Sequence, residues 1–195
     1  MALNSIQICN MALSHLGLPR ISSFAESTKA AQECDLMFEN IRDATLRAFP
    51  WTFARKVVKL SLLSDEDPPD YDFAYAYPSD CLYALEFYMG GKQQPVWEVR
   101  AQTLCPGKMI VTDHEDATLI YTARITDPAY FDPLFAKAFS YHLASELAQP
   151  LTKRTNIQEA MLQVYDRVLA SARAVDANEG WADDSFSSDF LEARS

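Results

Sequence analysis

The sequence predicts an α+β protein, a bundle of about four helices packed with a central antiparallel β meander. Apolar residues recur at steps of three and four near both ends of the chain, as on the buried face of a helix. The middle of the chain alternates apolar and polar residues and is broken by proline, glycine and aspartate. We expect the helices to pack together on the sheet within one domain, residues 1–176, followed by an extended tail, residues 177–195. The predicted elements are helices 4–17, 27–49, 133–149 and 156–175, and a β region 51–126.

The first two helices form a predicted αα-hairpin. Asn4 or Ser5 can cap the first helix, and Gly17 provides a stop after it. For the second helix, Ser27 is a candidate N-cap, while Ser23 with Glu26 forms an alternative capping box.

Pro50 ends the second helix, because a residue that precedes proline is disfavoured in the α conformation. The period then changes at Trp51, and residues 51–63 are predicted to form a strand. A long helix that turns directly into a strand ties the helical layer to the sheet, and the rest of the chain is expected to build on this joint.

The β region is divided by polar turns. Residues 64–70 contain two prolines and four acids, which cannot lie inside a sheet. Gly90-Gly91 is a hairpin signal, and 113–116 is a tight acidic turn. The strands expected between these turns are 71–77, 81–89, 95–99, 109–112 and 117–126.

Helical periodicity returns at Asp132-Pro133, a cap followed by proline in the first turn. The third helix has little polar face, so we expect it to be buried on two or three sides and to end at Pro150. Thr155 with Gln158 can cap the fourth helix, which should continue to about Val175.

The composition limits the possible partners. The formal net charge is −10, which argues against sequence-independent DNA binding, although a negative wall could let DNA slide past. No leader or membrane-spanning segment is predicted, so we expect a cytoplasmic site of synthesis. The four cysteines are widely spaced and are expected to be free and mostly buried, rather than a zinc site or a disulfide framework: Cys9, Cys34, Cys81 and Cys105.

No catalytic, cofactor or metal site is predicted. His142 and Glu146 lie four residues apart on a helix and could form half of a metal or acid–base site, but a polar edge on a mostly buried helix is the favoured interpretation. His15 has no evident partner, and His114 is expected to be solvated. Gly90-Gly91-Lys92 lacks the context of a phosphate loop. The acidic loop Asp65-Glu66-Asp67 with Asp70 could bind calcium weakly, although a solvated loop is the simpler interpretation.

The tail combines acidic and serine residues with large apolar side chains. Two interpretations stay open, a frayed end or a segment that becomes ordered on a partner. In the second, the aromatic residues would be anchors and the arginine a charge clamp, as Trp181, Phe186, Phe190, Leu191 and Arg194.

Several segments, in this order and spacing, resemble the tail tubular protein A family, the head-to-tail adaptors of short-tailed bacteriophages and prophages. The resemblance covers roughly residues 4 to 175 and is weakest at 64–70 and 90–116. It rests on Ala12-Leu-Ser-His-Leu-Gly17, Ile21-Ser-Ser-Phe24, Glu26-Ser-Thr-Lys-Ala-Ala31, Arg42-Asp-Ala-Thr-Leu-Arg-Ala-Phe-Pro-Trp-Thr-Phe-Ala54, Ala76-Tyr-Pro-Ser-Asp-Cys-Leu82, residues 121–135 and Leu143-Ala-Ser-Glu-Leu-Ala148.

The resemblance implies a structural virion protein that forms a ring, twelve-fold in the family, beneath the portal and lets DNA pass without specific binding. We expect the tail to dock on the portal, and the acidic turns to face the next tail or nozzle protein, through Asp65, Glu66, Asp67, Asp113, Glu115 and Asp116. Two alternatives stay open: a small cytosolic hydrolase that uses carboxylates as acid and base, and an oligomeric scaffold unrelated to phage.

Overall fold

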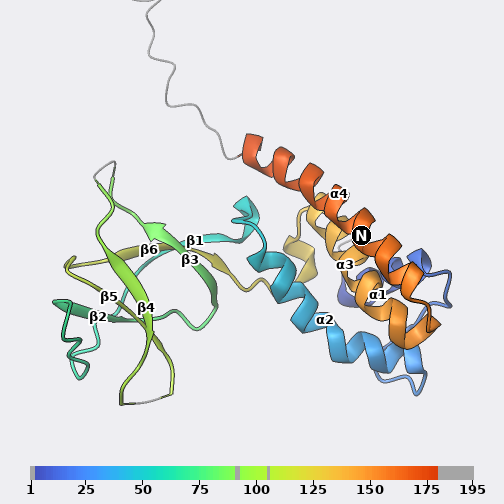
Figure 1. The fold of residues 1–195 in the computed structure, drawn as a ribbon, viewed down its shortest axis with the longest axis horizontal. Coiled ribbons are helices and arrows are strands. Elements are labelled where there is room, and N and C mark those ends of the chain that lie inside the picture. The colour runs from blue at the N-terminus through green and yellow to red at the C-terminus, as the bar shows by residue number, and fades with distance from the viewer. Residues whose placement is uncertain (1–2, 91–92, 105, 180–195) are drawn as a thin grey trace, which may run out of the picture.

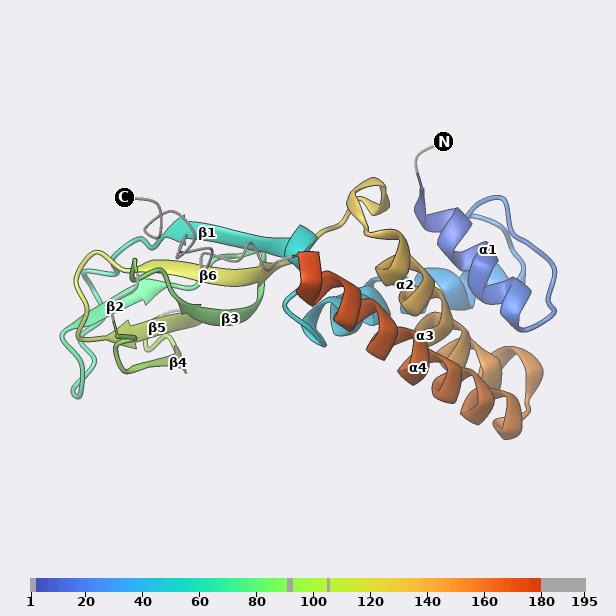
Figure 2. The ribbon, with the colours of Figure 1, turned by 90° about the horizontal axis from the view of Figure 1, so that it is seen from above.

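The computed structural model describes residues 3–90, 93–104 and 106–179, and Figure 1 draws their ribbon. It has an α+β fold, with four α-helices and two antiparallel sheets of three strands each in this part of the chain. The helices gather at one end of the molecule and the strands at the other, as both ribbon views show (Figure 1, Figure 2). The fold class is confirmed, but the helices lie beside the β region and do not cover it as a layer.

Helix α1 (Ser5–His15) begins and ends as its sequence predicts. The Asn4 side chain accepts a hydrogen bond from the Gln7 N–H, and the Gln7 side chain accepts one from the Asn4 N–H, at 2.9 Å each. After the helix, Gly17 takes the left-handed conformation at φ +70°. The Leu18 N–H then reaches back to the Leu13 carbonyl at 2.9 Å, which closes the helix end.

Helix α2 (Lys29–Arg47) starts two residues later than expected. Its cap is Thr28 and not Ser27, because the Thr28 hydroxyl accepts the hydrogen bond from the Ala31 N–H. The alternative start at Ser23 is also wrong. There the Glu26 carboxylate accepts the N–H groups of Ser22 and Ser23, which forms a separate turn before the helix.

Helices α3 (Pro133–Thr152) and α4 (Thr155–Glu179) form the C-terminal pair. Asp132 caps α3 as predicted, accepting from the N–H groups of Leu134 and Phe135. Pro150 does not end α3: it lies inside the helix, which loses the one N–H that proline lacks and still continues to Thr152. The helix ends instead at Lys153, which is left-handed at φ 57°. Helix α4 continues four residues beyond the predicted end at Val175.

The helical core surrounds α3, which contacts α1, α2 and α4 and is therefore buried on several sides, as its sequence predicts. Burying this much apolar surface is the main force that holds the bundle together. The largest fully buried side chains of this end are Trp51, Phe135, Phe139, Ile8, Leu13, Leu46, Leu143 and Leu147.

The strands are antiparallel, but they do not form a single meander. In the first sheet the central strand β6 pairs with β1 and β3, and in the second β5 pairs with β2 and β4. Among the described strands, only β4 and β5 are neighbours both in sequence and in a sheet. The strands are β1 (Arg55–Lys59), β2 (Phe73–Ala76), β3 (Cys81–Phe87), β4 (Trp97–Ala101), β5 (Lys108–Thr112) and β6 (Thr118–Ala123).

The two sheets share one apolar core that includes Leu60, Tyr75, Phe87, Ile110 and Leu119. The predicted strand 51–63 is divided between them. Residues 52–54 form a 3-10 turn, 55–59 form β1, and the chain then crosses to the second sheet, where the Leu63 N–H donates to the Ala74 carbonyl at 2.8 Å.

None of the described helices is both long enough and apolar enough to cross a membrane.

Candidate functional site

The joint between α2 and β1 is the place where the helical end meets the β end. Trp51, at its centre, is fully buried, and its ring packs edge-on against Phe49 and Phe135, with centroids 5.2 Å away in each case. The Trp51 Nε1–H donates to the Thr45 carbonyl at 3.1 Å. The joint is therefore fixed by packing and by a hydrogen bond to the preceding helix.

The end of α4 binds this joint through two charged residues. The Arg173 guanidinium lies over the Phe49 ring, and its Nη2–H donates to the Ala48 carbonyl at 2.7 Å, at the C-terminal end of α2. The Asp176 carboxylate accepts hydrogen bonds from the Thr52 N–H and hydroxyl, each at about 3.0 Å. Asp176 is only 8% exposed. These contacts hold the last turns of α4 where the β end begins.

A second set of charges links α2 to the first sheet. Asp43 accepts from the Arg42 Nε–H at 2.9 Å and, through its other oxygen, from the Arg124 Nε–H at 2.7 Å. Arg124 directly follows β6. One helix turn later, the Arg47 Nη1–H donates to the Leu82 carbonyl of β3 at 2.7 Å. Both links join backbone or charged groups far apart in the sequence, so they fix the helical end to the β end.

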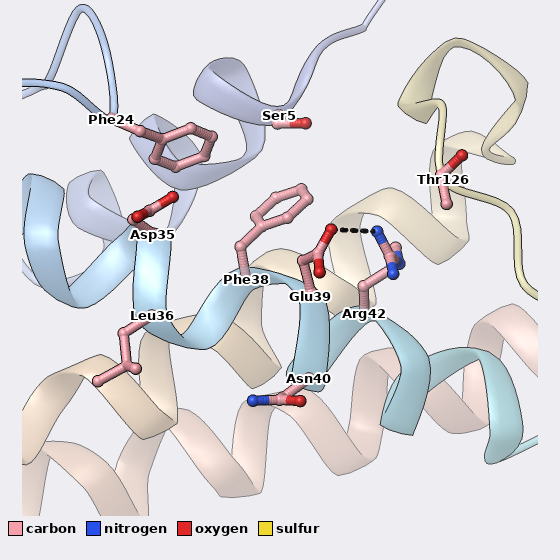
Figure 3. A pocket seen from close by; sticks show the side chains of 9 residues that line it. All are labelled: Ser5, Phe24, Asp35, Leu36, Phe38, Glu39, Asn40, Arg42 and Thr126. Atoms are coloured by element: carbon pink, nitrogen blue, oxygen red, sulfur yellow. Dashed lines mark ion pairs between the residues drawn. The ribbon is translucent and has the colours of Figure 1, made fainter.

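A cleft of about 440 Å³ lies beside α2 near the start of α1 (Figure 3). Its charged groups are Asp35, Glu39 and Arg42, and the Arg42 Nη1 is 3.6 Å from the Glu39 carboxylate, as the dashed line marks. The Arg42 side chain is 4% exposed, whereas that of Glu39 is 78% exposed. Since the guanidinium also binds Asp43, it serves as a fixed charge in the wall of the cleft.

His142 serves to hold helices together. Its Nδ1 lies 2.8 Å from the Thr45 hydroxyl, and that hydroxyl donates to the Ile41 carbonyl at 2.7 Å. Nδ1–H is therefore the donor toward Thr45. The imidazole stacks on the Tyr165 ring at 4.4 Å, and burial lowers the pKa of His142. Within the described residues, no hydrogen bond or ion pair joins His142 to Glu146, so the predicted i, i+4 pair is not brought together.

His15 is held in the same way between α1 and α3. It stacks on Tyr141 at 3.9 Å, and its Nε2 lies 3.1 Å from the Ser140 hydroxyl. Burial and the nearby Lys137 lower the pKa of His15. His114, which we expected to be solvated, is half-buried near Phe87. The sequence pattern could not reveal these partners, because they come from distant segments.

The cysteines give no metal site in the part of the chain that is described. Cys9 of α1 and Cys34 of α2 are free, buried and in one core cluster, and Cys81 is half-buried. Residues 3–90, 93–104 and 106–179 contain no group of three histidine, cysteine or acidic side chains that could hold a metal ion. Cys105, Gly91 and Lys92 lie outside the described residues.

The predicted acidic turns lie at the end of the β region farthest from the helices (Figure 1). The chain just after the first turn is linked to the second, because the Asp72 N–H donates to the Asp113 carboxylate at 3.1 Å. Glu66 accepts from the N–H groups of Thr103 and Leu104, which lowers its pKa. Asp116 forms an exposed ion pair with Lys59 at 2.9 Å. Within these turns Asp65, Asp67 and Glu115 are exposed.

Two groups of residues remain to be placed: the predicted tail residues, and two charged residues of α4 that were not predicted. The tail residues Trp181, Phe186, Phe190, Leu191 and Arg194 lie outside the described residues. Sequence reasoning missed the charged contacts of Arg173 and Asp176. Their spacing of three on α4 is the only local signal, and many solvent-exposed pairs share that spacing.

The comparisons with known proteins found no matching family: no protein-family model matches the chain, and no curated protein sequence matches it.

Proposed function

We propose that this chain is a structural virion protein, a head-to-tail adaptor that assembles as a ring beneath the portal. In this role it links the capsid portal to the tail and forms part of the DNA conduit. The observation that carries the proposal is the two-ended build, in which helices and acidic β turns occupy opposite ends. An adaptor must bind two different neighbours, and two chemically different ends suit that task.

Lateral contacts between copies would come from the helical end. A closed ring needs two different surfaces on each subunit, because each copy contacts the next head-to-tail. Helices α1 and α4 both pack on α3 but lie on different sides of it (Figure 2), which supports such an arrangement. A ring of twelve copies is what the family resemblance implies.

The β end would face the next tail or nozzle protein. Its acidic turns are accompanied by exposed apolar side chains, which are common where proteins meet. These are Leu62, Tyr88, Val96, Val99 and Leu104. A net charge of −10 suits a conduit whose wall should not bind DNA.

The portal contact would include residues 180–195, with Trp181, Phe186, Phe190 and Leu191 as anchors and Arg194 as a charge clamp. The chain enters this segment from the end of α4, which Arg173 and Asp176 fix at the joint. The segment therefore starts from a defined point on the molecule. Assembly would take place in the host cytoplasm, before the ring becomes part of the virion.

The test is the mass of the protein alone and after mixing with the portal protein of the same virus. The proposal predicts a complex of one portal with many copies of this chain. A matched variant, with Trp181, Phe186 and Phe190 each replaced by serine, should lose the complex while keeping its helical circular dichroism. An unrelated oligomeric scaffold would have the same fold but would not bind the portal. A hydrolase would have no need to bind the portal either, so the absence of a complex would favour one of these two alternatives.

A further inference from the structure

Strand β1 has one open edge. It is the outermost strand of the sheet β1-β6-β3, and no described strand lies along its other side. All five of its residues, Arg55–Lys59, are exposed. An open edge presents unpaired backbone N–H and C=O groups, to which another extended segment can add.

The side chains of β1 also leave apolar surface exposed to solvent. Val57 is 57% exposed, and its cross-strand partner on β6 is Ile120. The same face of the sheet carries Tyr83, which is 47% exposed. The strand has three basic residues in a chain of net charge −10: Arg55, Lys56 and Lys59. Each is in an exposed ion pair, with Glu86, Asp80 and Asp116, and such pairs exchange partners at little cost.

The last described turn of α4 lies near the start of β1. Asp176 binds Thr52, three residues before β1 starts, so Glu179 leaves the helix near the first residues of the strand. Both ribbon views place the end of α4 next to the start of β1 (Figure 1, Figure 2). A segment that continues from there along β1 runs parallel to it. Ten extended residues span roughly 33 Å, about twice the length of a five-residue strand.

The sequence of the segment that follows α4 complements the exposed side chains of β1 in both charge and apolar character. Phe186 and Phe190 have the same parity, so both would lie on one face of an added strand and could cover Val57. The segment carries four acids, Asp183, Asp184, Asp189 and Glu192, against the basic residues of β1. Serine separates the aromatic residues, and the segment has no proline, so every residue could donate an N–H.

We propose that residues 182–191 add to the open edge of β1 of the same chain as a parallel strand. The pairing would cover Val57. It would also give hydrogen-bond partners to the backbone N–H and C=O groups at the open edge of β1 while the protein is not bound to a portal. It concerns the chain by itself, so it stands or falls independently of portal binding. If the adaptor role is correct, the portal would have to displace the same residues from β1.

Hydrogen exchange of the full chain, measured by mass spectrometry on peptides that cover β1, tests the pairing. The double variant Ser185→Pro and Ser188→Pro removes N–H donors of both parities and changes no charge or aromatic residue. Its matched control is Ser185→Ala with Ser188→Ala. We expect the edge amides of β1 to exchange roughly tenfold faster in the proline variant than in the control or the natural chain. Amides of β5 should not change.

Three outcomes overturn the proposal. Equal exchange of β1 in the proline variant and its control would show that no strand is added there. Protection that rises with protein concentration would assign the edge to the tail of a second copy. Faster exchange in both β1 and β5 would mean that the proline variant loosens the whole β region. In that case a synthetic peptide of residues 180–195 is added to the variant, and it should restore the protection of the β1 amides alone. If the peptide fails to restore it, the pairing is wrong.

Discussion

Asp176, in the last turns of α4, accepts hydrogen bonds from both the N–H and the hydroxyl of Thr52, a residue 124 positions earlier in the chain. Thr52 opens the 3-10 turn that leads from α2 into β1. The carboxylate therefore satisfies a backbone donor that the turn leaves free. This contact, together with that of Arg173, places the end of the last helix at the centre of the molecule.

Replacing Asp176 by alanine should destabilise the protein. The change leaves the Thr52 N–H and hydroxyl without a partner in a nearly buried place, which costs about 1–3 kcal/mol. Thermal unfolding followed by circular dichroism measures the loss. The exposed Glu159 of the same helix gives the control Glu159→Ala, which should stay within about 0.5 kcal/mol of the natural chain. Equal melting temperatures for the two variants would contradict the role of Asp176.

Trp51→Phe tests the packing at the centre of the joint. Phenylalanine keeps part of the aromatic packing but removes the donor to the Thr45 carbonyl and leaves a small cavity, so we expect a loss of about 2–4 kcal/mol. Urea unfolding gives the value. Trp97, which is half-buried in β4, provides the control Trp97→Phe, with a smaller loss. If the two variants unfold at the same urea concentration, the joint is not the most tightly held part of the fold.

Local signals in the sequence were enough to place the helices and the joint. Asn4, Gly17 and Asp132 act through groups within four residues of themselves, so their roles are visible in a short window. The change of period after Pro50 was less reliable, because the strand expected from Trp51 begins only at Arg55, after a 3-10 turn.

What the sequence could not predict depends on distant partners. The alternating pattern of 118–123 indicates a strand but does not say that β6 lies between β1 and β3. Pro150 was misleading because α3, which is held by its packing, continues past a proline that costs it a single N–H donor. The partners of Arg173, Asp176 and His142 lie on other elements, and a charged residue that binds across the fold has the same local pattern as one in water.

Stability should decrease as the pH is lowered through the range where two half-buried histidines, His15 and His142, titrate. The folded pKa values of His15 and His142 are below the ordinary 6.5, through burial, with Lys137 adding to the effect at His15 and Asp166 opposing it at His142. The unfolded chain then binds more protons near and below pH 6.5. The stabilisation is therefore full above about pH 7 and is lost as the pH falls through 6.5 toward the folded values.

Urea unfolding at several pH values between about 5.5 and 7.5 checks this dependence. His15→Gln and His142→Gln should each reduce the slope of unfolding free energy against pH, and the double variant should reduce it most. Parallel curves for the natural chain and the double variant would show that other groups cause the dependence.

Neutralising the exposed acids of the β end should weaken binding to the next tail protein and leave the fold intact. Asp65→Asn, Asp67→Asn and Glu115→Gln are the suitable changes, because Glu66 and Asp113 hold backbone groups in place. Binding of the natural chain should fall as salt rises, and the triple variant should have lost most of that dependence. Glu159→Gln with Asp166→Asn, at the helical end, is the control. A triple variant with unchanged affinity and salt dependence would exclude the acidic turns from the contact.

The most direct test of the two-ended adaptor is electron microscopy of this chain mixed with its portal protein. The account predicts a ring of copies beneath the portal, with the helical ends side by side against it and the β ends pointing away, around a central channel. Portal particles without added density, or a ring whose β ends meet the portal, would contradict it.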